Sequence, residues 1–504
     1  MDNDQKRTLI AFLLIIIILL IWSYTTRPSS SKTSGIEKKK SQLSDTAKIS
    51  PSDSDKSLLS GDTIVIEKDF YRATFSSAGG SLKSLYLKKY NADIVPEGAY
   101  LFLTKISDTT INFKYIVDDD SIVFLQNINN KNFIKIYQFD QDYSFKLKLN
   151  YPDTISHILS LKSGLRITEK KNQVDDLRHF NAYIQSKNFN NITKEIRDRL
   201  VFKEDWHWIA LRSKYFVLII NNAKSAGYPA FYKLSHLDKG LDMLKGNLGC
   251  AVSSNTNRYG VEIFANSSFE LRVLFLPIKH SELAKFKCGY EQIEGGGIWR
   301  PIARLIISIL NLFYNIFKNY GVAIIVFAFL LKIIFFPLSR QMLISQRQMQ
   351  LLQPELKKIQ EKYRNDPQAL NREMMHLYKV YNVNPFSGCL PILIQFPIFV
   401  ALYQVLSTSI EFRGAPFALW ITDLSIKDPY YILPVGMGVL MLIQSLMTTI
   451  DPRQRFMVIL MPLIMVFFFL NFPSGLQLYW FTYNILSILE QLMIKNKFLK
   501  LTTK

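Results

Sequence analysis

Residues 320–338 read YGVAIIVFAFLLKIIFFPL, a nearly unbroken apolar run. The run is long enough to cross a bilayer core of about 30 Å as a helix. Lys332 is its one charged residue. Because a charge near the middle of a span costs about 2.5–3.5 kcal/mol on insertion scales, we expect Lys332 to face protein or water. The alternative is that its side chain extends to the nearer membrane surface, since the run ends soon after it. Lys332 is therefore a candidate functional residue.

The composition of the 504-residue chain fits two or three domains, with 48% apolar residues and a formal charge of +20. The basic residues lie beside apolar spans, which favours an anionic membrane surface over a nucleic-acid site. Three cysteines without CxxC spacing argue against a disulfide framework or a zinc site. The sequence has no HExxH, Gly-x-Ser-x-Gly or GxxxxGK[ST] motif, so we expect no metal, no cofactor and no hydrolase chemistry.

Residues 1–27 are predicted to form a short cytoplasmic stub and a signal-anchor span. An apolar run, Leu9 to Trp22, follows Lys6 and Arg7. A cleaved signal peptide is the alternative, but no A-x-A-like site follows the run. The positive-inside rule places Lys6 and Arg7 in the cytoplasm. Residues 28–60 are rich in Ser, Lys, Asp and Thr, which is typical of a disordered linker.

Residues 61–292 are predicted to form a large β-sandwich outside the membrane. Apolar and polar residues alternate from Tyr143 to Leu149 and again from Phe269 to Phe275, the pattern of half-buried antiparallel strands. Turn residues such as Gly79-Gly80 separate many such runs. We expect Trp206 and Trp208 to lie in the core, although a sugar-binding sandwich remains an alternative.

Residues 293–318 are predicted to form an amphipathic helix in the membrane interface. Its polar residues recur at spacings of three and four, as one stripe on an apolar helix: Arg300, Arg304, Ser308, Asn311, Asn315 and Lys318. A core helix of the sandwich is the weaker alternative, because the next residues enter the bilayer.

Residues 319–494 are predicted to form a membrane core of five spans, which with the first span makes six and places both termini in the cytoplasm. The five spans are 319–339, 386–407, 430–448, 456–472 and 475–494. Residues 340–385, between the first two, are basic and have helical periodicity on both sides of Asn365-Asp366-Pro367, which predicts a cytoplasmic helical hairpin. Residues 495–504 form a basic cytoplasmic tail. The candidate hairpin residues are Lys357, Lys358, Lys362, Arg364, Asp366 and Pro367.

Polar residues within these spans suggest a hydrated cavity around Lys332. Taken singly, each is best explained as a bond between helices, worth about 0.6 kcal/mol on average. Together with Lys332 they favour a water-filled groove. The candidate groove residues are Lys332, Gln395, Tyr403, Gln444, Tyr479 and Asn484.

Several stretches closely resemble the bacterial YidC membrane protein insertases of the YidC/Oxa/Alb family. These are NPFSGCLPILIQFPIFVALYQVL (384–406), QPELKKIQEKYRNDPQALNREMMHLYK (353–379), APFALWITDLSIKDPYYILP (415–434) and FPSGLQLYW (472–480). The match is nearly gapless over residues 319–495. The stretches around DFYRATFSSAGG and DWHWIALRSKYF match the family's periplasmic domain more loosely. The resemblance implies a membrane α-helical core joined to a periplasmic all-β sandwich of the galactose mutarotase type.

The resemblance implies insertion of newly made proteins into the bacterial inner membrane, alone or beside the Sec translocon. It also implies a hydrophilic groove with a positive residue at the position of Lys332, where the family pattern has arginine. Trp480 stands where relatives often have tyrosine. The expected partners are nascent membrane proteins, Sec translocon subunits, anionic lipid and, transiently, the ribosome. The short tail after Ile494 argues against stable ribosome docking.

In the resulting hypothesis, Lys332 attracts acidic residues of a client, while Gln395 and Tyr479 keep the groove wet. The drive is partition of apolar client residues into lipid, so no nucleotide is needed. An enzyme using Lys332 as a base is a rival, but Ser445 and Ser487 lack a His partner and Glu490 is interpreted as standing alone. A transporter is a second rival, for which internal repeats are expected and not found.

Overall fold

The computed structural model describes residues 61–502 apart from 107–108, 129, 141, 152–156, 170–172, 187, 194, 197–198, 203–205, 223–248, 256–257, 266–267, 296, 382, 384–389 and 449–454. The chain divides into two compact units, Met1–Ile293 and Glu294–Lys504. The predicted first span and linker lie outside the described residues.

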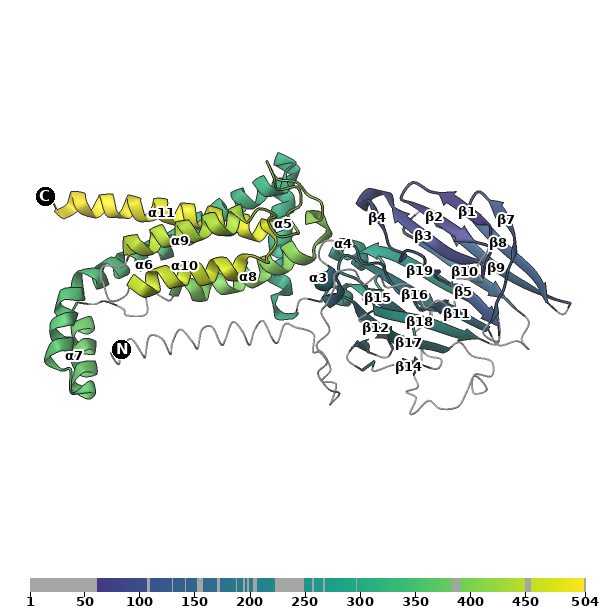
Figure 1. The fold of residues 1–504 in the computed structure, drawn as a ribbon, viewed down its shortest axis with the longest axis horizontal. Helices are drawn as coiled ribbons and strands as arrows, with labels where there is room; N and C mark the ends of the chain where they lie inside the picture. The colour runs from purple at the N-terminus through teal and green to yellow at the C-terminus, as the bar shows by residue number, and fades with distance from the viewer. Residues whose placement is uncertain are drawn as a thin grey trace, which may run out of the picture. The chain divides into compact units, whose positions relative to one another are not determined.

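The first unit is built from three antiparallel sheets (Figure 1). The four-stranded sheet contains, in order, β1 (Thr63–Glu67), β2 (Tyr71–Ser76), β3 (Ser81–Leu87) and β4 (Ala92–Asp93). The nine-stranded sheet contains β13 (Phe189–Asn191), β12 (Asn181–Gln185), β15 (Trp208–Arg212), β16 (Phe216–Asn222), β19 (Phe269–Pro277), β10 (Ser144–Asn150), β9 (Lys131–Phe139), β8 (Ser121–Ile128) and β7 (Lys114–Asp118). The six-stranded sheet contains β14 (Arg199–Phe202), β17 (Gly249–Asn255), β18 (Arg258–Ala265), β11 (His157–Leu161), β5 (Leu103–Ile106) and β6 (Thr109–Thr110).

The two alternating runs found in the sequence pair with each other in the middle of the nine-stranded sheet. In β10 and β19, Phe145 lies opposite Val273 and Leu147 lies opposite Leu271, and all four side chains are buried. Because side chains alternate across a strand, the polar partners lie on the other face. The rings of Phe145 and Phe102 pack edge to face, with their centres 5.8 Å apart. The predicted all-β fold class of this unit is confirmed.

Trp206 and Trp208 are core residues, as predicted, with 1% and 2% of their surface exposed. Trp208 Nε1 donates a hydrogen bond of 3.2 Å to the carbonyl oxygen of Cys288. Its ring packs edge-on against Tyr290 in η5 (Tyr290–Glu294). These contacts fix the segment that follows β19, including α4 (His280–Ala284), against the sheet.

Lys135 is buried in β9 with no exposed surface. Its Nζ donates to the carbonyl oxygens of Gly79 and Phe102 and to Thr104 Oγ1, at 3.1, 2.5 and 3.1 Å. No carboxylate is among these partners, and burial holds the pKa of Lys135 well below its ordinary value. The amine therefore joins the nine-stranded sheet to neighbouring backbone carbonyl groups by hydrogen bonds.

We expect the free energy of unfolding of the β unit to increase as the pH rises toward about 10.4, the pKa of an unfolded lysine. Below that pH the Lys135 amine binds a proton more strongly in the unfolded state than in the folded state, and raising the pH removes this advantage of the unfolded state. Lys135→Met should flatten this dependence, since methionine has no proton to lose. Urea midpoints of the detergent-solubilised full chain, followed by tryptophan fluorescence between neutral and alkaline pH, measure the difference. An unchanged slope in Lys135→Met would contradict the prediction.

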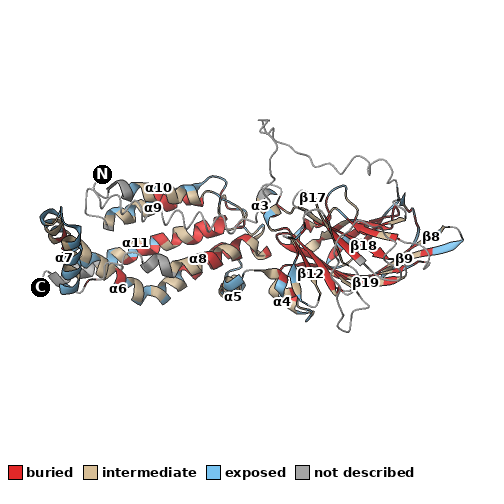
Figure 2. Ribbon diagram, turned by 90° about the horizontal axis from the view of Figure 1, so that it is seen from below, coloured by how far each residue is buried: buried red, intermediate tan, exposed pale blue. Residues whose placement is uncertain are grey.

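The second unit is helical. Its elements are η6 (Gly297–Trp299), α5 (Arg300–Phe317), α6 (Tyr320–Lys362), α7 (Pro367–Val380), α8 (Leu390–Thr408), η8 (Ile410–Phe412), α9 (Ile432–Thr448), α10 (Arg455–Phe469) and α11 (Ser474–Thr502). Helix α6 packs against α5 and α11, and α11 also packs against α8 and α9. Figure 2 shows buried stretches of α8 and α11 within this bundle.

Two helices extend beyond the predicted ends of their spans. The boundary expected at residue 339 falls inside the 43-residue α6, which passes through Pro337 and Pro354. A proline removes one helical hydrogen bond and crowds the preceding turn. Close to Pro337, a hydrogen bond from Ser339 to Glu490 joins α6 to α11. Likewise α11 runs to Thr502, past residue 494, where the predicted span ends.

Among the described residues, the helices long and apolar enough to cross a membrane are Gly297–Phe317 and Tyr320–Lys362. Ile432–Met447 and Ile459–Phe469 are shorter apolar helices. The helical core of the predicted fold class is confirmed, while the number of six spans stays a prediction.

The segment around Asn365-Asp366-Pro367 joins α6 to α7. Asp366 accepts hydrogen bonds of 3.0 Å from the backbone N–H groups of Gln368 and Ala369, and Pro367 is the first helical residue. Carboxylate capping and proline at the first position both favour a helix start. Leu352, Leu356 and Val383 form a small buried core between the two helices.

Candidate functional site

Lys332 forms an ion pair inside the helical unit. Its Nζ lies 2.7 Å from Oε2 of Glu490 on α11, and the two side chains are 12% and 4% exposed. The same Nζ donates a hydrogen bond of 2.9 Å to Ser487 Oγ and lies 4.7 Å from the centre of the Tyr483 ring. The interpretation of Glu490 as a residue standing alone is therefore wrong. The Lys332 charge faces protein, in agreement with its expected cost in lipid.

Glu490 is held by two residues of α6. Ser339 Oγ donates a short hydrogen bond to Glu490 Oε1, while Lys332 approaches Oε2. The two α6 residues are two helical turns apart, so they present side chains on the same face. Tyr483, Ser487 and Glu490 likewise follow one face of α11. The contact between α6 and α11 thus buries a charged pair with polar neighbours, an arrangement that is stable only when both charges stay paired.

Three amides on α11 recur at intervals of seven residues: Gln477, Asn484 and Gln491. Each has one buried side-chain atom without a hydrogen-bond partner among the described residues, namely Gln477 Oε1, Asn484 Nδ2 and Gln491 Oε1. Gln477 Nε2 does donate, at 2.9 and 3.0 Å, to the carbonyl oxygens of Phe469 and Phe472. An unpaired buried polar group costs about 1–3 kcal/mol, so this row of amides is suited to water or to a passing polar chain.

Gln395 and Tyr479 are in direct contact, because Gln395 Nε2 donates a hydrogen bond of 2.7 Å to the Tyr479 hydroxyl. The ring of Tyr479 lies 6.0 Å from that of Tyr483, which in turn lies beside Lys332. The structure therefore connects three of the candidate groove residues, Gln395, Tyr479 and Lys332, through Tyr483. Asn484 is on the same helix as Tyr479 and Tyr483.

Tyr403 and Gln444 are placed differently. The Tyr403 ring packs edge-on against Phe472 at 5.1 Å, in an aromatic cluster that also contains Phe399 and Phe469. Trp480 belongs to this cluster, with its ring 5.5 Å from Phe399 and 5.3 Å from Phe469. Gln444 is half-buried on α9. These contacts fit a packing role for Tyr403 and Trp480.

The predicted groove residues do not include Ser339, Tyr483, Ser487, Glu490 or Gln491. The interval of seven residues from Gln477 through Asn484 to Gln491 was visible in the sequence and could have identified Gln491. Nothing in the sequence indicated which residue of α11 faces Lys332. The pairing depends on the relative rotation of two helices that are far apart in the chain.

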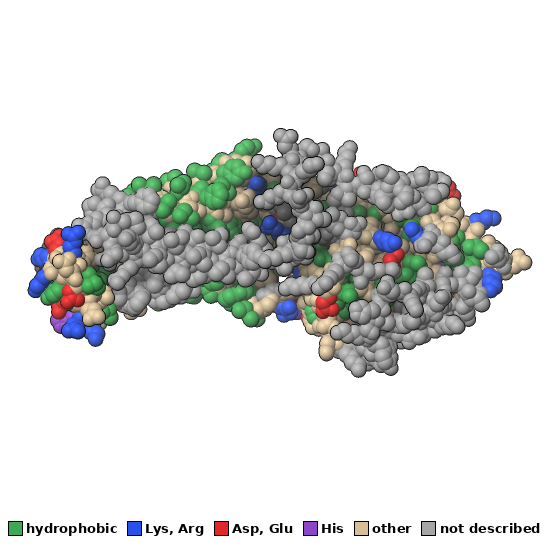
Figure 3. Space-filling model, turned by 60° about the horizontal axis from the view of Figure 1, so that its bottom comes forward, with side chains coloured by type: hydrophobic (Ala, Val, Ile, Leu, Met, Phe, Trp, Pro, Cys, Tyr) green, Lys and Arg blue, Asp and Glu red, His purple; other side chains and the backbone are tan. Residues whose placement is uncertain are grey.

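The candidate hairpin residues lie at the end of α6 and the start of α7. Lys358, Lys362, Arg364, Asp366 and Pro367 are exposed, and Lys357 is half-buried. Figure 3 shows Lys and Arg side chains gathered at the α7 end of the helical unit. Of these residues, Asp366 and Pro367 have a clear local role, since they start α7.

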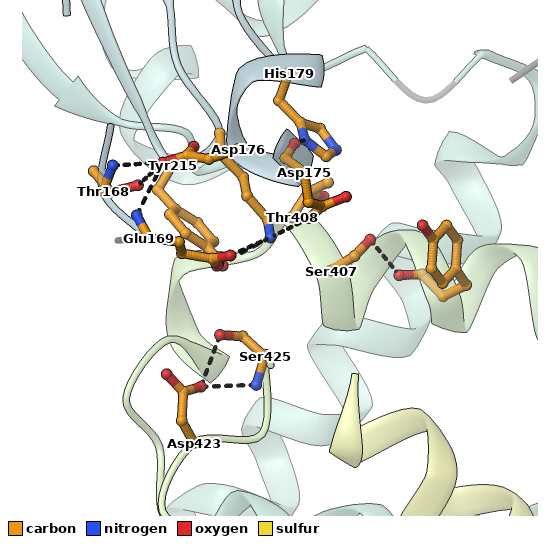
Figure 4. Close-up of polar contacts among 12 residues, drawn as sticks. Thr168, Glu169, Asp175, Asp176, His179, Tyr215, Ser407, Thr408, Asp423 and Ser425 are labelled. Carbon is orange, nitrogen blue, oxygen red and sulfur yellow. Dashed lines mark hydrogen bonds and ion pairs between the residues drawn. The ribbon is translucent and has the colours of Figure 1, made fainter. Parts of the chain in front are cut away.

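A second polar cluster lies in the β unit (Figure 4). Lys214 Nζ donates to both carboxylate oxygens of Glu169 at 3.0 Å and to Asp175 at 2.8 Å, and Tyr215 donates a short hydrogen bond to Glu169. Burial alone lowers the pKa of Lys214, but Tyr215, Asp175 and Glu169 raise it above its ordinary value. Burial raises the pKa of Glu169, and Lys214 offsets this only in part.

This cluster anchors the segment before β12 to the turn between β15 and β16. Asp176 accepts hydrogen bonds from the backbone N–H groups of Thr168 and Glu169 and from Thr168 Oγ1. Lys214 is 1% exposed, so the cluster is internal. Within the described residues, no three His, Cys, Asp or Glu side chains are grouped so that they could hold a metal ion.

Known proteins are similar to this chain over both the β unit and the helical unit. Residues 312–501 match the family model described as 60Kd inner membrane protein. The membrane protein insertase YidC of Geotalea daltonii is 31% identical over 547 residues, covering 97% of this chain and 99% of that protein. The YidC of Geobacter sp. strain M21 is 31% identical and covers 86% of this chain and 85% of that protein. A crystal structure of an active YidC insertase is 20% identical, with a TM-score of 0.40, and covers 85% of this chain and 92% of that one.

The fold and the buried cluster define a helical membrane protein with an appended β-sandwich. The chain belongs to the YidC family of membrane protein insertases. The family is not a family of enzymes, so the enzyme alternative considered for Lys332 is excluded.

Proposed function

We propose that this insertase works through a groove along α11, in which Lys332 engages acidic residues of a client segment. The observation that carries the proposal is the Lys332–Glu490 pair. The relatives are named membrane protein insertases. We infer that the substrates of this chain are newly made inner-membrane proteins.

In this mechanism, Glu490 takes the place of the client's carboxylate between cycles. A client carboxylate that arrives at Lys332 exchanges with Glu490, so one ion pair replaces another. At about 4 Å the new pair gains roughly 4 kcal/mol at an effective dielectric constant of 20, which offsets the loss of the Lys332–Glu490 pair.

The amide row on α11 supplies the polar lining. Gln477, Asn484 and Gln491 each offer an unpaired buried atom to water or to the client backbone. The client's apolar segment leaves this lining for lipid, and its partition supplies the driving force. Gln395 and Tyr479 extend the polar lining to α8.

The remaining parts of the chain have proposed roles. We infer that the basic end of the α6–α7 hairpin receives the client in the cytoplasm and contacts anionic lipid, because Lys358, Lys362 and Arg364 are exposed there. The Sec translocon and, transiently, the ribosome are proposed partners. We also propose six spans with both termini in the cytoplasm, the β unit in the periplasm and α5 as the interfacial helix.

Site-specific crosslinking tests the groove. A photo-reactive side chain at Asn484 or Gln491 should capture a single-spanning client during insertion into proteoliposomes that contain the full chain. Leu489, on the same helix but 50% exposed, is the matched control and should capture less client. Stronger capture at Leu489 than at both amide positions would place the client outside the proposed groove.

A further inference from the structure

The strand β7 is an open edge of the nine-stranded sheet. It lies at the end of the strand order and pairs with β8, from Lys114 opposite Leu125 to Asp118 opposite Ser121. All five of its residues are exposed. No other described strand pairs with β7. Its outer N–H and C=O groups are therefore available to another strand.

The side chains of β7 are unusual for an exposed edge. Tyr115, Ile116 and Val117 are 38%, 59% and 46% exposed. Edges are commonly protected by charges, prolines, bulges or short length. The other edge of the same sheet follows that rule, because β13 has only three residues and two of them are asparagine. The edge at β7 instead presents three consecutive residues that favour strand pairing.

The sequence of β7 is complementary to itself in one antiparallel register. With Ile116 opposite Ile116 of a second copy, Lys114 lies opposite Asp118 at both ends, and Tyr115 lies opposite Val117. Opposite charges and aromatic–β-branched pairs are favourable cross-strand neighbours. Because residues two apart share a face, the two ion pairs flank the isoleucine pair on one face of the joined sheets.

Other arrangements of the two strands lack this match. A parallel pair places Lys114 opposite Lys114 and Asp118 opposite Asp118, which is repulsive. A shift of the antiparallel register by two residues places Ile116 opposite either Lys114 or Asp118 and removes both ion pairs. An unrelated extended peptide has no reason to carry the reversed charge pattern. The occupant that fits the edge is a second copy of this chain.

We propose that β7 is a homodimerisation edge, through which two copies join their nine-stranded sheets about a twofold axis at Ile116. A contact of one strand per copy is smaller than the roughly 1,200–2,000 Å² of a stable interface, so it is weak in dilute solution. Two copies held in one membrane meet at a much higher effective concentration. The pairing therefore belongs to the membrane-embedded protein.

Disulfide crosslinking of the full chain in proteoliposomes tests the pairing. In a background with Cys250→Ala, Cys288→Ser and Cys389→Ser, Ile116→Cys should give a covalent dimer on mild oxidation. Asn190→Cys, exposed on β13 at the opposite edge of the same sheet, is the control and should not. Equal crosslinking at the two edges, or capture of a client chain in place of a second copy, overturns the proposal.

Charge reversal tests the register. Lys114→Glu or Asp118→Lys in the crosslinking background should reduce the dimer about fivefold or more, because each places like charges opposite each other at both ends. The two reversals in one chain should restore it. A mixture of the two single variants should give the mixed dimer. Single reversals without effect, or a double variant without recovery, overturn the proposed register.

Discussion

Lys332→Ala should lower the insertion of a single-spanning client with an acidic outer segment by about tenfold or more, since one lost interaction of about 1.4 kcal/mol already gives that factor. The substitution removes the positive charge that the client's carboxylate meets. It also leaves Glu490, which is 4% exposed, without its counter-ion. Insertion into proteoliposomes, measured as protection of the client from protease, gives the rate.

The loss has to be separated from misfolding, because breaking a buried pair costs about 3–5 kcal/mol. Lys332→Met combined with Glu490→Gln removes both charges and leaves no unpaired ion. This double variant should stay folded and still fail to insert the acidic client. Lys332→Arg should insert it, since arginine keeps the charge.

Glu490→Gln alone separates the role of the Lys332 charge from that of the Glu490 carboxylate. It leaves the Lys332 position without its internal competitor, so the acidic client should insert at least as well as with the unchanged protein. A client whose outer segment has no acidic residue should respond little to any of these variants. If Lys332→Ala inserts the acidic client normally, the charge is not the working element and the amide row on α11 becomes the principal candidate.

The parts of the fold that depend on local patterns were predictable. Alternation from Tyr143 to Leu149 and from Phe269 to Phe275 predicted two strands, which form β10 and β19. Asp366 and Pro367 predicted the start of α7, because capping depends only on residues next to each other in sequence. An apolar run with one charge predicted that Lys332 would avoid lipid.

The features that sequence reasoning missed depend on long-range packing. Lys332 and Glu490 are on helices far apart in the chain, and only their packing reveals the pair. The continuation of α6 through Pro337 reflects support from neighbouring helices, which overrides the local preference of proline. The buried amines of Lys135 and Lys214 could not be distinguished from surface lysines by the local sequence. Lysine alternating with apolar residues, as at Lys135, usually marks the solvent face of a strand. Lysine in a turn, as at Lys214, is usually exposed.

Lys214→Ala should lower the free energy of unfolding of the β unit by about 3–5 kcal/mol, the typical cost of breaking a buried ion pair. Lys214 is 1% exposed and neutralises Glu169 and Asp175, which are 6% and 22% exposed. The substitution leaves both carboxylates without their shared cation. Hydrogen exchange of β15 and β16 in the detergent-solubilised full chain at increasing urea concentration measures the loss.

Lys162→Ala is the matched control for Lys214→Ala. Lys162 also pairs with a glutamate, Glu262, at 3.1 Å, but its side chain is 63% exposed, so water screens the charge and the loss should be about 0–1 kcal/mol. The loss in the free energy of unfolding caused by Lys214→Ala should become smaller as the pH falls. Burial already raises the pKa of Glu169, and without the lysine the folded state takes up a proton there before the unfolded state does. A Lys214→Ala loss no larger than that of Lys162→Ala would mean that water screens the cluster, in conflict with its burial.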